Sequence, residues 1–343
     1  MRGQWPAMTL RTHLMAAAAW LMFCGTVSHA APLAITPFNA INQSPLVQIF
    51  GLPSTGSAAV LGKGRGEFLV SQDIANSMSV DSNSREMIFL DGEGYRTLLS
   101  VRHGIGNRCE IGLELPFVGY GGGVFDSFIE GWHQTFGLPN GDRSSYPRNR
   151  LLFRYDRDGS RRLLVDNSGF GLGDIRLTGA LQLFREETLR PRALALRSSL
   201  KIPTGDSGQL RGSGSTDFAL WLSASDDYGV ALGHVSLFGS AGGMVMSKGD
   251  VLPDQQRVVA GFGSLGIGWA PADWIALILQ FSGNTPLYQG STLTELSGAS
   301  LQLHSGGTLR LAETTFLDIA VSEDIAVNTA PDVALHLAIR HQF

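Results

Sequence analysis

From residue 66 to the end of the chain, apolar and polar side chains alternate in one segment after another. In the last segment, 332–343, Val333, Leu335 and Ile339 would share one face of a strand, and His336 and Arg340 would share the other. The segments at 108–117, 171–184, 192–203 and 316–325 repeat this pattern. A period of two residues predicts β-strands with one apolar and one polar face. The chain is therefore predicted to be all-β.

A soluble β-sandwich also alternates, so the pattern alone leaves that class open. Three features favour a membrane-spanning barrel. The polar faces carry many charges, whereas the apolar faces consist almost entirely of Leu, Ile, Val and Ala. Tyr120, Trp269 and Phe281 stand at strand ends, as in the aromatic girdles of barrels. Short and long connections alternate. We therefore predict a transmembrane antiparallel β-barrel.

The alternating segments give a count of about twelve strands. They lie near 66–79, 86–104, 108–119, 169–185, 192–203, 215–225, 230–246, 257–270, 274–284, 294–311, 315–325 and 332–343. An even number with both chain ends on the periplasmic side is typical of outer-membrane barrels.

The first thirty residues resemble a secretory signal. Arg2 and Arg11 precede an apolar stretch at 14–25, which is too short to span a bilayer, and Ser28 and Ala30 provide small residues before a cleavage point. We predict that residues 1–30 are removed. Without Arg2 and Arg11, 24 basic and 30 acidic residues remain, a net charge of −6, which argues against nucleic-acid binding. Cys109 would then be the one cysteine left, so no internal disulfide is expected.

Residues 31–65 fit no strand. They contain four prolines, an apolar stretch "PLVQIFGLP" and a glycine-rich "GKGRG". Because the apolar stretch is unlike a solvated linker, we expect this segment to act as a plug in the lumen or at the periplasmic mouth.

The connection at 119–168 is long enough to form an extracellular lid. Its first part, 124–137, has apolar residues at helical spacing, and its second part has a hairpin signal at Asp158-Gly159. Asp126, Glu130 and His133 would lie on one face of the helix, where a solvated polar face is a simpler interpretation than a metal or acid–base site.

Guanidinium groups bind phosphate in a bidentate manner, so the arginines of this loop are candidates for lipopolysaccharide contact, with neutralisation by nearby Asp as the alternative. These candidates are Arg148, Arg150, Arg154, Arg157, Arg161 and Arg162.

The polar faces of the strands would point into the lumen. The candidate pore-lining residues are Asp174, Arg176, Arg197, Lys201, Asp217, Trp221, Asp318, Asp324, His336 and Arg340. We expect opposite charges on neighbouring strands to pair, with Asp318 and Asp324 facing His336 and Arg340. A lumen of mixed sign predicts no strong ion selectivity and is compatible with a solute path or with a cross-braced interior. No catalytic residue or metal site is predicted. No cofactor is predicted either, because "GFGSLG" (261–266) lies within a strand and lacks the helix that a dinucleotide site needs.

Two stretches carry a family resemblance. "SLKIPTGDSGQLRGSGSTDFAL" (199–220) resembles the Lys-x-Pro-Thr-Gly-Asp region of the outer-membrane meta-pathway phenol degradation family. "LDGEGYR" (90–96), "GLGDI" (171–175) and the stretch at 114–143 are more similar to an uncharacterised proteobacterial outer-membrane barrel family. The resemblance implies a barrel in the outer membrane of a Gram-negative bacterium, and it brings no substrate or catalytic residue.

The chain ends on Phe343, and a terminal aromatic on an alternating strand resembles the signal that the barrel assembly machinery recognises. We therefore expect a monomeric outer-membrane channel or binding protein for a small solute, with apolar or aromatic compounds as one class. A structural protein with a sealed lumen that contacts lipopolysaccharide is the alternative. An outer-membrane enzyme using His133 or His103 is a third and weaker one.

Overall fold

The structure, a computed structural model, describes residues 32–123, 149–187, 190–325 and 329–343. Residues 33–343 belong to one compact unit. The predicted signal peptide, the predicted helix at 124–137 with Asp126, Glu130 and His133, and Arg148 all lie outside the described residues.

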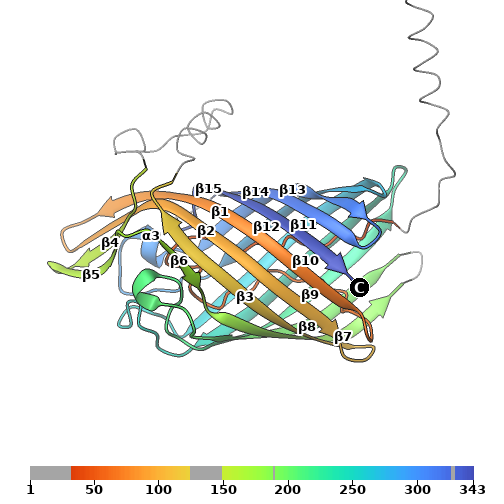
Figure 1. Cartoon of the computed structure of the whole chain (residues 1–343), viewed down its shortest axis with the longest axis horizontal. Helices are drawn as coiled ribbons and strands as arrows, with labels where there is room; N and C mark the ends of the chain where they lie inside the picture. The colour runs from red at the N-terminus through yellow and green to blue at the C-terminus, as the bar shows by residue number, and fades with distance from the viewer. Residues whose placement is uncertain (1–31, 124–148, 188–189, 326–328) are drawn as a thin grey trace, which may run out of the picture. The chain divides into compact units, whose positions relative to one another are not determined.

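The described strands form a single antiparallel sheet that closes into a twelve-strand barrel (Figure 1). The barrel strands are β1 (Gly66–Ser82), β2 (Glu86–Gly104), β3 (Cys109–Gly121), β6 (Gly169–Leu172) with β7 (Ile175–Glu186), β8 (Arg192–Ile202), β9 (Asp217–Gly229), β10 (His234–Met246), β11 (Val259–Ala272), β12 (Ile275–Asn284), β13 (Ser300–Ala312), β14 (Thr315–Asp324) and β15 (Val333–Gln342). β6 and β7 fill one position, because both pair with β3. The prediction of an all-β barrel of about twelve strands is confirmed.

The barrel closes where the first strand meets the last. β1 and β15 pair from Glu67↔Gln342 to Asn76↔Val333. Gly66 and Phe343 exchange main-chain hydrogen bonds, with N–O distances of 2.8 and 3.0 Å. The sheet therefore has no open edge along the barrel wall, as a membrane-spanning sheet requires.

The period-two pattern sorts side chains between the two faces. In β8, Lys201 is 1% exposed and faces the lumen, while Leu200 and Ile202 are exposed on the outside. Trp269, Trp274 and Tyr228 are exposed near the turns at the end that holds the C-terminus, where an aromatic girdle is expected. Tyr120 is an exception to the sequence analysis: it points inward and donates a hydrogen bond to the carbonyl oxygen of Leu210 at 2.7 Å.

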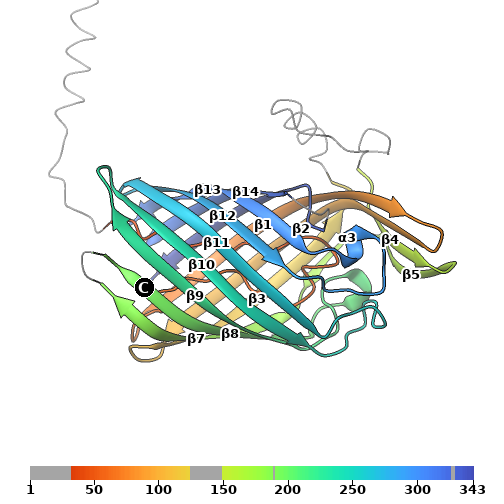
Figure 2. The ribbon, with the colours of Figure 1, turned by 180° about the vertical axis from the view of Figure 1, so that it is seen from behind.

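The two ends of the barrel differ. At the C-terminal end, short turns join β2 to β3, β9 to β10, β11 to β12 and β13 to β14, whereas most connections at the other end are longer, the short β1–β2 turn at 83–85 being an exception (Figures 1 and 2). β1 and β2 extend beyond the barrel at that end, where β2 pairs with β4 (Leu152–Arg157), which forms a hairpin with β5 (Ser160–Val165). Asp158 and Gly159 both have positive φ, 50° and 72°, as a two-residue hairpin turn requires, so the hairpin prediction is confirmed.

Helical structure is minor in the described residues. η2 (Ser207–Gln209) is a single 3₁₀ turn and α3 (Thr294–Ser297) is one helical turn, both in long connections. Among the described residues, no helix has the length and apolar character needed to cross a membrane.

Candidate functional site

Residues 33–61, here called the N-terminal segment, occupy the lumen (Figure 2). The side chain of Ile35 lies against Gly268 of β11, and the Phe38 N–H donates to Oε1 of Gln280 in β12 at 3.0 Å. Asn42 reaches Ser300, the first residue of β13, with Nδ2 2.9 Å from the hydroxyl oxygen. After a turn at Ser44, the chain returns until the Leu61 N–H donates to Glu110 of β3 at 2.9 Å. The segment thus passes along the lumen twice.

The segment has no strand or helix of its own, apart from the turn. Pro37, Pro45 and Pro53 lack the N–H group that a ladder needs, so its peptide groups require other partners. Side chains of the barrel wall provide them.

The carbonyl oxygens of residues 49–60 accept hydrogen bonds from inward-facing side chains. Arg176 donates from Nη2 to Phe50 and from Nη1 to Leu52, both at 3.0 Å. Trp221 donates to Thr55 at 3.0 Å, and Arg197 donates to Ser57 at 2.7 Å. Gln182 donates to Ala58 at 2.9 Å and accepts from the Val60 N–H at 2.8 Å. Strands β7, β8 and β9 therefore hold this part of the segment through its backbone.

Lys201 joins the segment to the Lys-x-Pro-Thr-Gly-Asp motif. Its Nζ lies 2.5 Å from Asp174 Oδ2, 3.3 Å from Asp217 Oδ2 and 2.6 Å from Ser213 Oγ, and it donates to the carbonyl oxygen of Ile49 at 3.2 Å. Through Lys201 and its bond to Ser213, the motif thus holds the loop after β8 against the inner side of the barrel.

The remaining pore-lining candidates are placed as follows. Arg340 donates to Asp318 at 2.7 Å. His336 lies 2.6 Å from Asp73 of β1, and Asp324 accepts from the Ala330 N–H at 3.2 Å near the rim. The expected facing of Asp324 with His336 or Arg340 is thus not the arrangement observed.

One network at the C-terminal end of the lumen was not singled out from the sequence. Arg102 of β2 bonds both Glu67 of β1, at 2.5 Å, and Glu110 of β3, at 2.9 Å, and Arg197 also contacts Glu110, at 3.3 Å. The same alternation that identified Arg197 puts these residues on the inner face and could have identified them.

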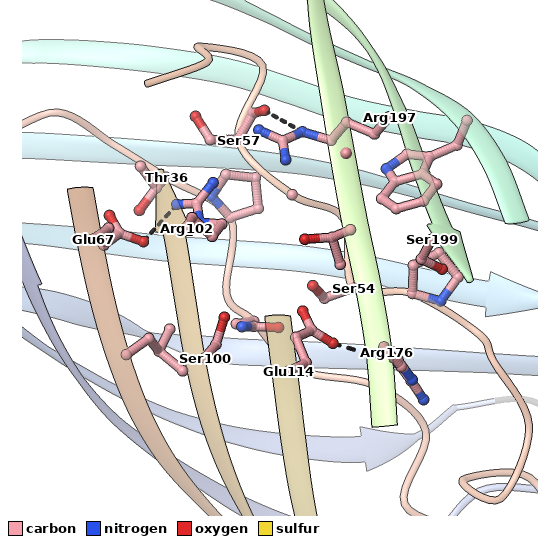
Figure 3. A pocket seen from close by; sticks show the side chains of 18 of the residues that line it. Thr36, Ser54, Ser57, Glu67, Ser100, Arg102, Glu114, Arg176, Arg197 and Ser199 are labelled. Atoms are coloured by element: carbon pink, nitrogen blue, oxygen red, sulfur yellow. Dashed lines mark hydrogen bonds and ion pairs between the residues drawn. The ribbon is translucent and has the colours of Figure 1, made fainter. Parts of the chain in front are cut away.

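Small cavities lie beside the segment within the described part of the barrel. A cavity of about 80 Å³ lies between the segment and strands β1, β2, β3, β7 and β8, lined by Glu67, Arg102, Glu114, Arg176 and Arg197 among others (Figure 3). A second cavity, of about 40 Å³, lies toward β10–β13. These volumes hold a few water molecules, whereas sites for small organic molecules measure roughly 300 Å³ or more.

The extracellular arginine candidates mostly pair with acids. Arg150 contacts Asp91 at 2.8 Å, Arg154 contacts Asp156 at 2.5 Å, and Arg157 contacts Glu86 at 3.3 Å. Arg162 pairs with Asp254. Arg161 is exposed on β5.

Burial and hydrogen bonding shift the pKa values of acids at this end of the barrel, opposite the C-terminus. Burial would raise the pKa of Glu86, but hydrogen bonds from Ser291 and Tyr155 outweigh it and hold that pKa below its ordinary value. The hydrogen bond from Arg85 likewise lowers the pKa of Asp158.

Comparison with known proteins identifies the family. Residues 19–343 match the family described as a protein of unknown function, DUF3187. The chain belongs to this family. No curated protein matches the chain.

Comparison with solved structures finds one barrel of the same fold at low sequence identity, and other barrels that align less well. An outer membrane channel from Pseudomonas putida F1 aligns with a TM-score of 0.51 and 15% identity, over 83% of this chain and 97% of the channel. The KdgM porin, solved with disordered oligogalacturonate, aligns at 0.39 and 6% identity, over 81% and 99%. The CymD monoaromatic hydrocarbon channel aligns at 0.35 and 12% identity, over 90% and 94%. The first of these supports an outer-membrane barrel fold for DUF3187 proteins.

Proposed function

We propose that this DUF3187 protein is a channel for a small solute in the outer membrane of a Gram-negative bacterium, closed in this conformation by its N-terminal segment. The observation that carries the proposal is the way the lumen is filled. Barrels of about eight strands can be filled by their own side chains, whereas twelve strands enclose more space. Here that space is taken by a separate piece of chain bonded mainly to wall side chains, which can leave without breaking the barrel's ladder.

The lining supports a polar solute in preference to the apolar or aromatic compounds considered from the sequence. Charged and hydroxyl groups form much of the lining of the larger cavity, and hydroxyl and amide groups form part of the lining of the smaller one. An apolar solute would displace the hydrogen-bond partners of these groups without replacing them, at a cost of about 1–3 kcal/mol for each unsatisfied group. Because the cavities are too small for such solutes, passage requires part of the segment to move.

A surface protein with a permanently sealed lumen is the second candidate. The number of hydrogen bonds that hold residues 49–61 favours it. In that case, among the candidates that the structure describes, lipopolysaccharide contact would fall to Arg161, since Arg150, Arg154, Arg157 and Arg162 have acidic partners.

Planar-bilayer recording separates the two candidates. The mature chain and a variant lacking residues 33–60 would be compared, after unheated gel migration has established that each barrel is folded. We expect rare openings from the mature chain and a steady conductance from the deletion variant. A folded deletion variant that never conducts would rule out the channel and leave the sealed protein.

A further inference from the structure

The two passages of the N-terminal segment are held differently. Residues 48–61, the returning arm, are bonded through the backbone to charged or polar side chains of β3, β7, β8 and β9. Beyond the contacts above, the Gly51 N–H donates to Asp217 at 2.7 Å, and Ser223 donates to the carbonyl oxygen of Thr55 at 2.8 Å. Each such bond is directional, so the arm is fixed at many points along its length.

Residues 33–43, the ascending arm, are held mainly by apolar contact. Leu33, Ile35, Phe38 and Ala40 pack in a cluster with residues of β10, β11, β12 and β14, including Phe238, Ala270, Ala276, Ile278 and Ala320. Among the described residues, the hydrogen bonds from this arm to the barrel are few: Phe38 to Gln280, and Asn42 to Ser300 and to the carbonyl oxygen of Thr329. Apolar contacts are non-directional, so this arm can slide or leave at lower cost than its partner.

The wall behind the ascending arm is almost uncharged. Across β10, β11, β12 and β13 a single Asp, Glu, Lys or Arg occurs, Arg310 near the C-terminal end of β13. The lumen face there carries hydroxyl and amide groups, namely Ser240, Ser264, Gln280, Ser282 and Gln302. The charged wall lies on the opposite side, where the returning arm or internal ion pairs engage it. The returning arm touches the neutral wall through Thr55, whose hydroxyl donates to Ser264 at 2.8 Å and accepts from Gln280 at 3.3 Å.

Both cavities border the ascending arm. The larger one is lined by Thr36, Pro37, Phe38 and Asn39, and the smaller one by Ala40, Ile41 and Asn42. Removing residues 33–43 would therefore join the two cavities and add the volume of the arm itself, while the returning arm stays on the charged wall.

We propose that the ascending arm is the gate, that the returning arm is a fixed part of the lumen wall, and that the open path runs along the hydroxyl and amide groups of β10–β13. Such a path suits uncharged solutes with several hydrogen-bonding groups, of the polyol or sugar class. This inference rests on the proposed channel function and specifies the solute class and the moving part.

Two variants of the gate test the first half. A chain lacking residues 33–43 should conduct nearly as well as the chain lacking 33–60. A full-length chain with Leu33→Asn, Ile35→Asn and Phe38→Asn should open more often than the native chain, which keeps the test valid if the shorter chain folds poorly. If the 33–60 deletion conducts while both gate variants stay closed, the gate inference is wrong and the channel remains. If none of these variants conducts, the proposed channel function is wrong.

A matched pair of substitutions tests the path. In the chain lacking 33–43, Gln280→Glu places one charge on the neutral wall, and Gln182→Glu places the same charge behind the returning arm. We expect Gln280→Glu to shift the permeability ratio of K⁺ to Cl⁻ several-fold toward K⁺, and Gln182→Glu to leave it near that of the parent. Equal shifts would refute the path along β10–β13.

Glucose uptake by liposomes provides the probe for solute class. The chain lacking 33–43 should admit glucose, and bulky replacement by Ser264→Trp on the neutral wall should reduce that uptake several-fold. Conductance without glucose entry would refute the assignment of uncharged polar solutes.

Discussion

Asp217 of β9 accepts a hydrogen bond from the backbone N–H of Gly51 at 2.7 Å, and this contact joins the barrel wall directly to the chain inside it. There is no room for a larger residue at position 51, because an added Cβ would lie 2.9 Å from the Cβ of Asp217. The same carboxylate lies 3.3 Å from Lys201 Nζ, so the segment and the Lys-x-Pro-Thr-Gly-Asp motif share one buried charge cluster.

Lys201→Met should destabilise the barrel strongly. The substitution leaves Asp174 and Asp217 buried without their common cation, and removal of one partner from a buried ion pair costs about 3–5 kcal/mol. The temperature at which the folded band disappears on a gel would measure the effect. Adding Asp174→Asn and Asp217→Asn should recover much of the loss, and a single variant as stable as the native chain would contradict the role assigned to this cluster.

Arg176→Gln should loosen the returning arm. It removes two hydrogen bonds to the backbone, at Phe50 and Leu52, and each is worth about 1 kcal/mol or somewhat more because the donor is charged. In a Cys109→Ser background, a cysteine introduced by Ser54→Cys should then react several-fold faster with a membrane-impermeant maleimide.

Arg340→Gln provides the control for that experiment. Arg340 is similarly buried, but its bonds go to Asp318 rather than to the segment. Equal acceleration by both substitutions would mean that general loosening of the barrel, and not release of the arm, exposes position 54.

The barrel could be predicted from the sequence because the face of every strand residue follows from the period of two. Leu200 and Lys201 show this: adjacent in the chain, one is exposed on the outside and the other is 1% exposed in the lumen. A closed barrel could then be predicted from the number of such strands and from the alternation of short and long connections between them.

The partners of the inward residues could not be predicted in the same way. Arg176 was expected to line a pore or to pair across the ladder; it lies 4.0 Å from Glu114 of β3, but it also binds the carbonyl oxygens of Phe50 and Leu52. Those acceptors belong to the backbone of a segment without periodicity, so no residue pattern marks them. Tyr120 was misplaced for a related reason, because an aromatic residue near a strand end fits a girdle and a lumen equally well. The near absence of charged residues in β10–β13 is visible in the sequence, and it could have indicated that this side of the lumen differs from the charged side.

The anchoring of the hairpin formed by β4 and β5 should depend on pH. Arg85 contacts Asp158 at 2.9 Å and lowers the pKa of that carboxyl below its ordinary 3.8. A lowered folded-state pKa means that the contribution is complete above the ordinary value and is lost as the pH falls through the folded value. Hydrogen-exchange protection factors for residues 152–165, corrected for intrinsic rates, should therefore be constant near neutrality and fall in acid.

Asp158→Asn is the control for that pH dependence. Asn tolerates the positive φ of this turn, so the hairpin keeps its shape while it loses the charge. Protection in the variant should be lower at neutral pH and should change less in acid. An unchanged acid profile would assign the effect to Glu86, whose pKa is also lowered, and not to Asp158.

Phe343→Ala should impair assembly more than stability. The main-chain bonds between Gly66 and Phe343 do not involve the ring, which is 64% exposed on the outer surface and lies beside Gly66. The closing ladder should therefore survive, and purified chain should refold in detergent with a yield close to that of the native chain. In cells, the amount of folded barrel in the outer membrane should fall several-fold, and Phe343→Trp, which keeps an aromatic terminus, should restore most of it. If refolding in detergent declines as much as assembly in cells, the ring contributes to the stability of the closed sheet and is not a recognition signal.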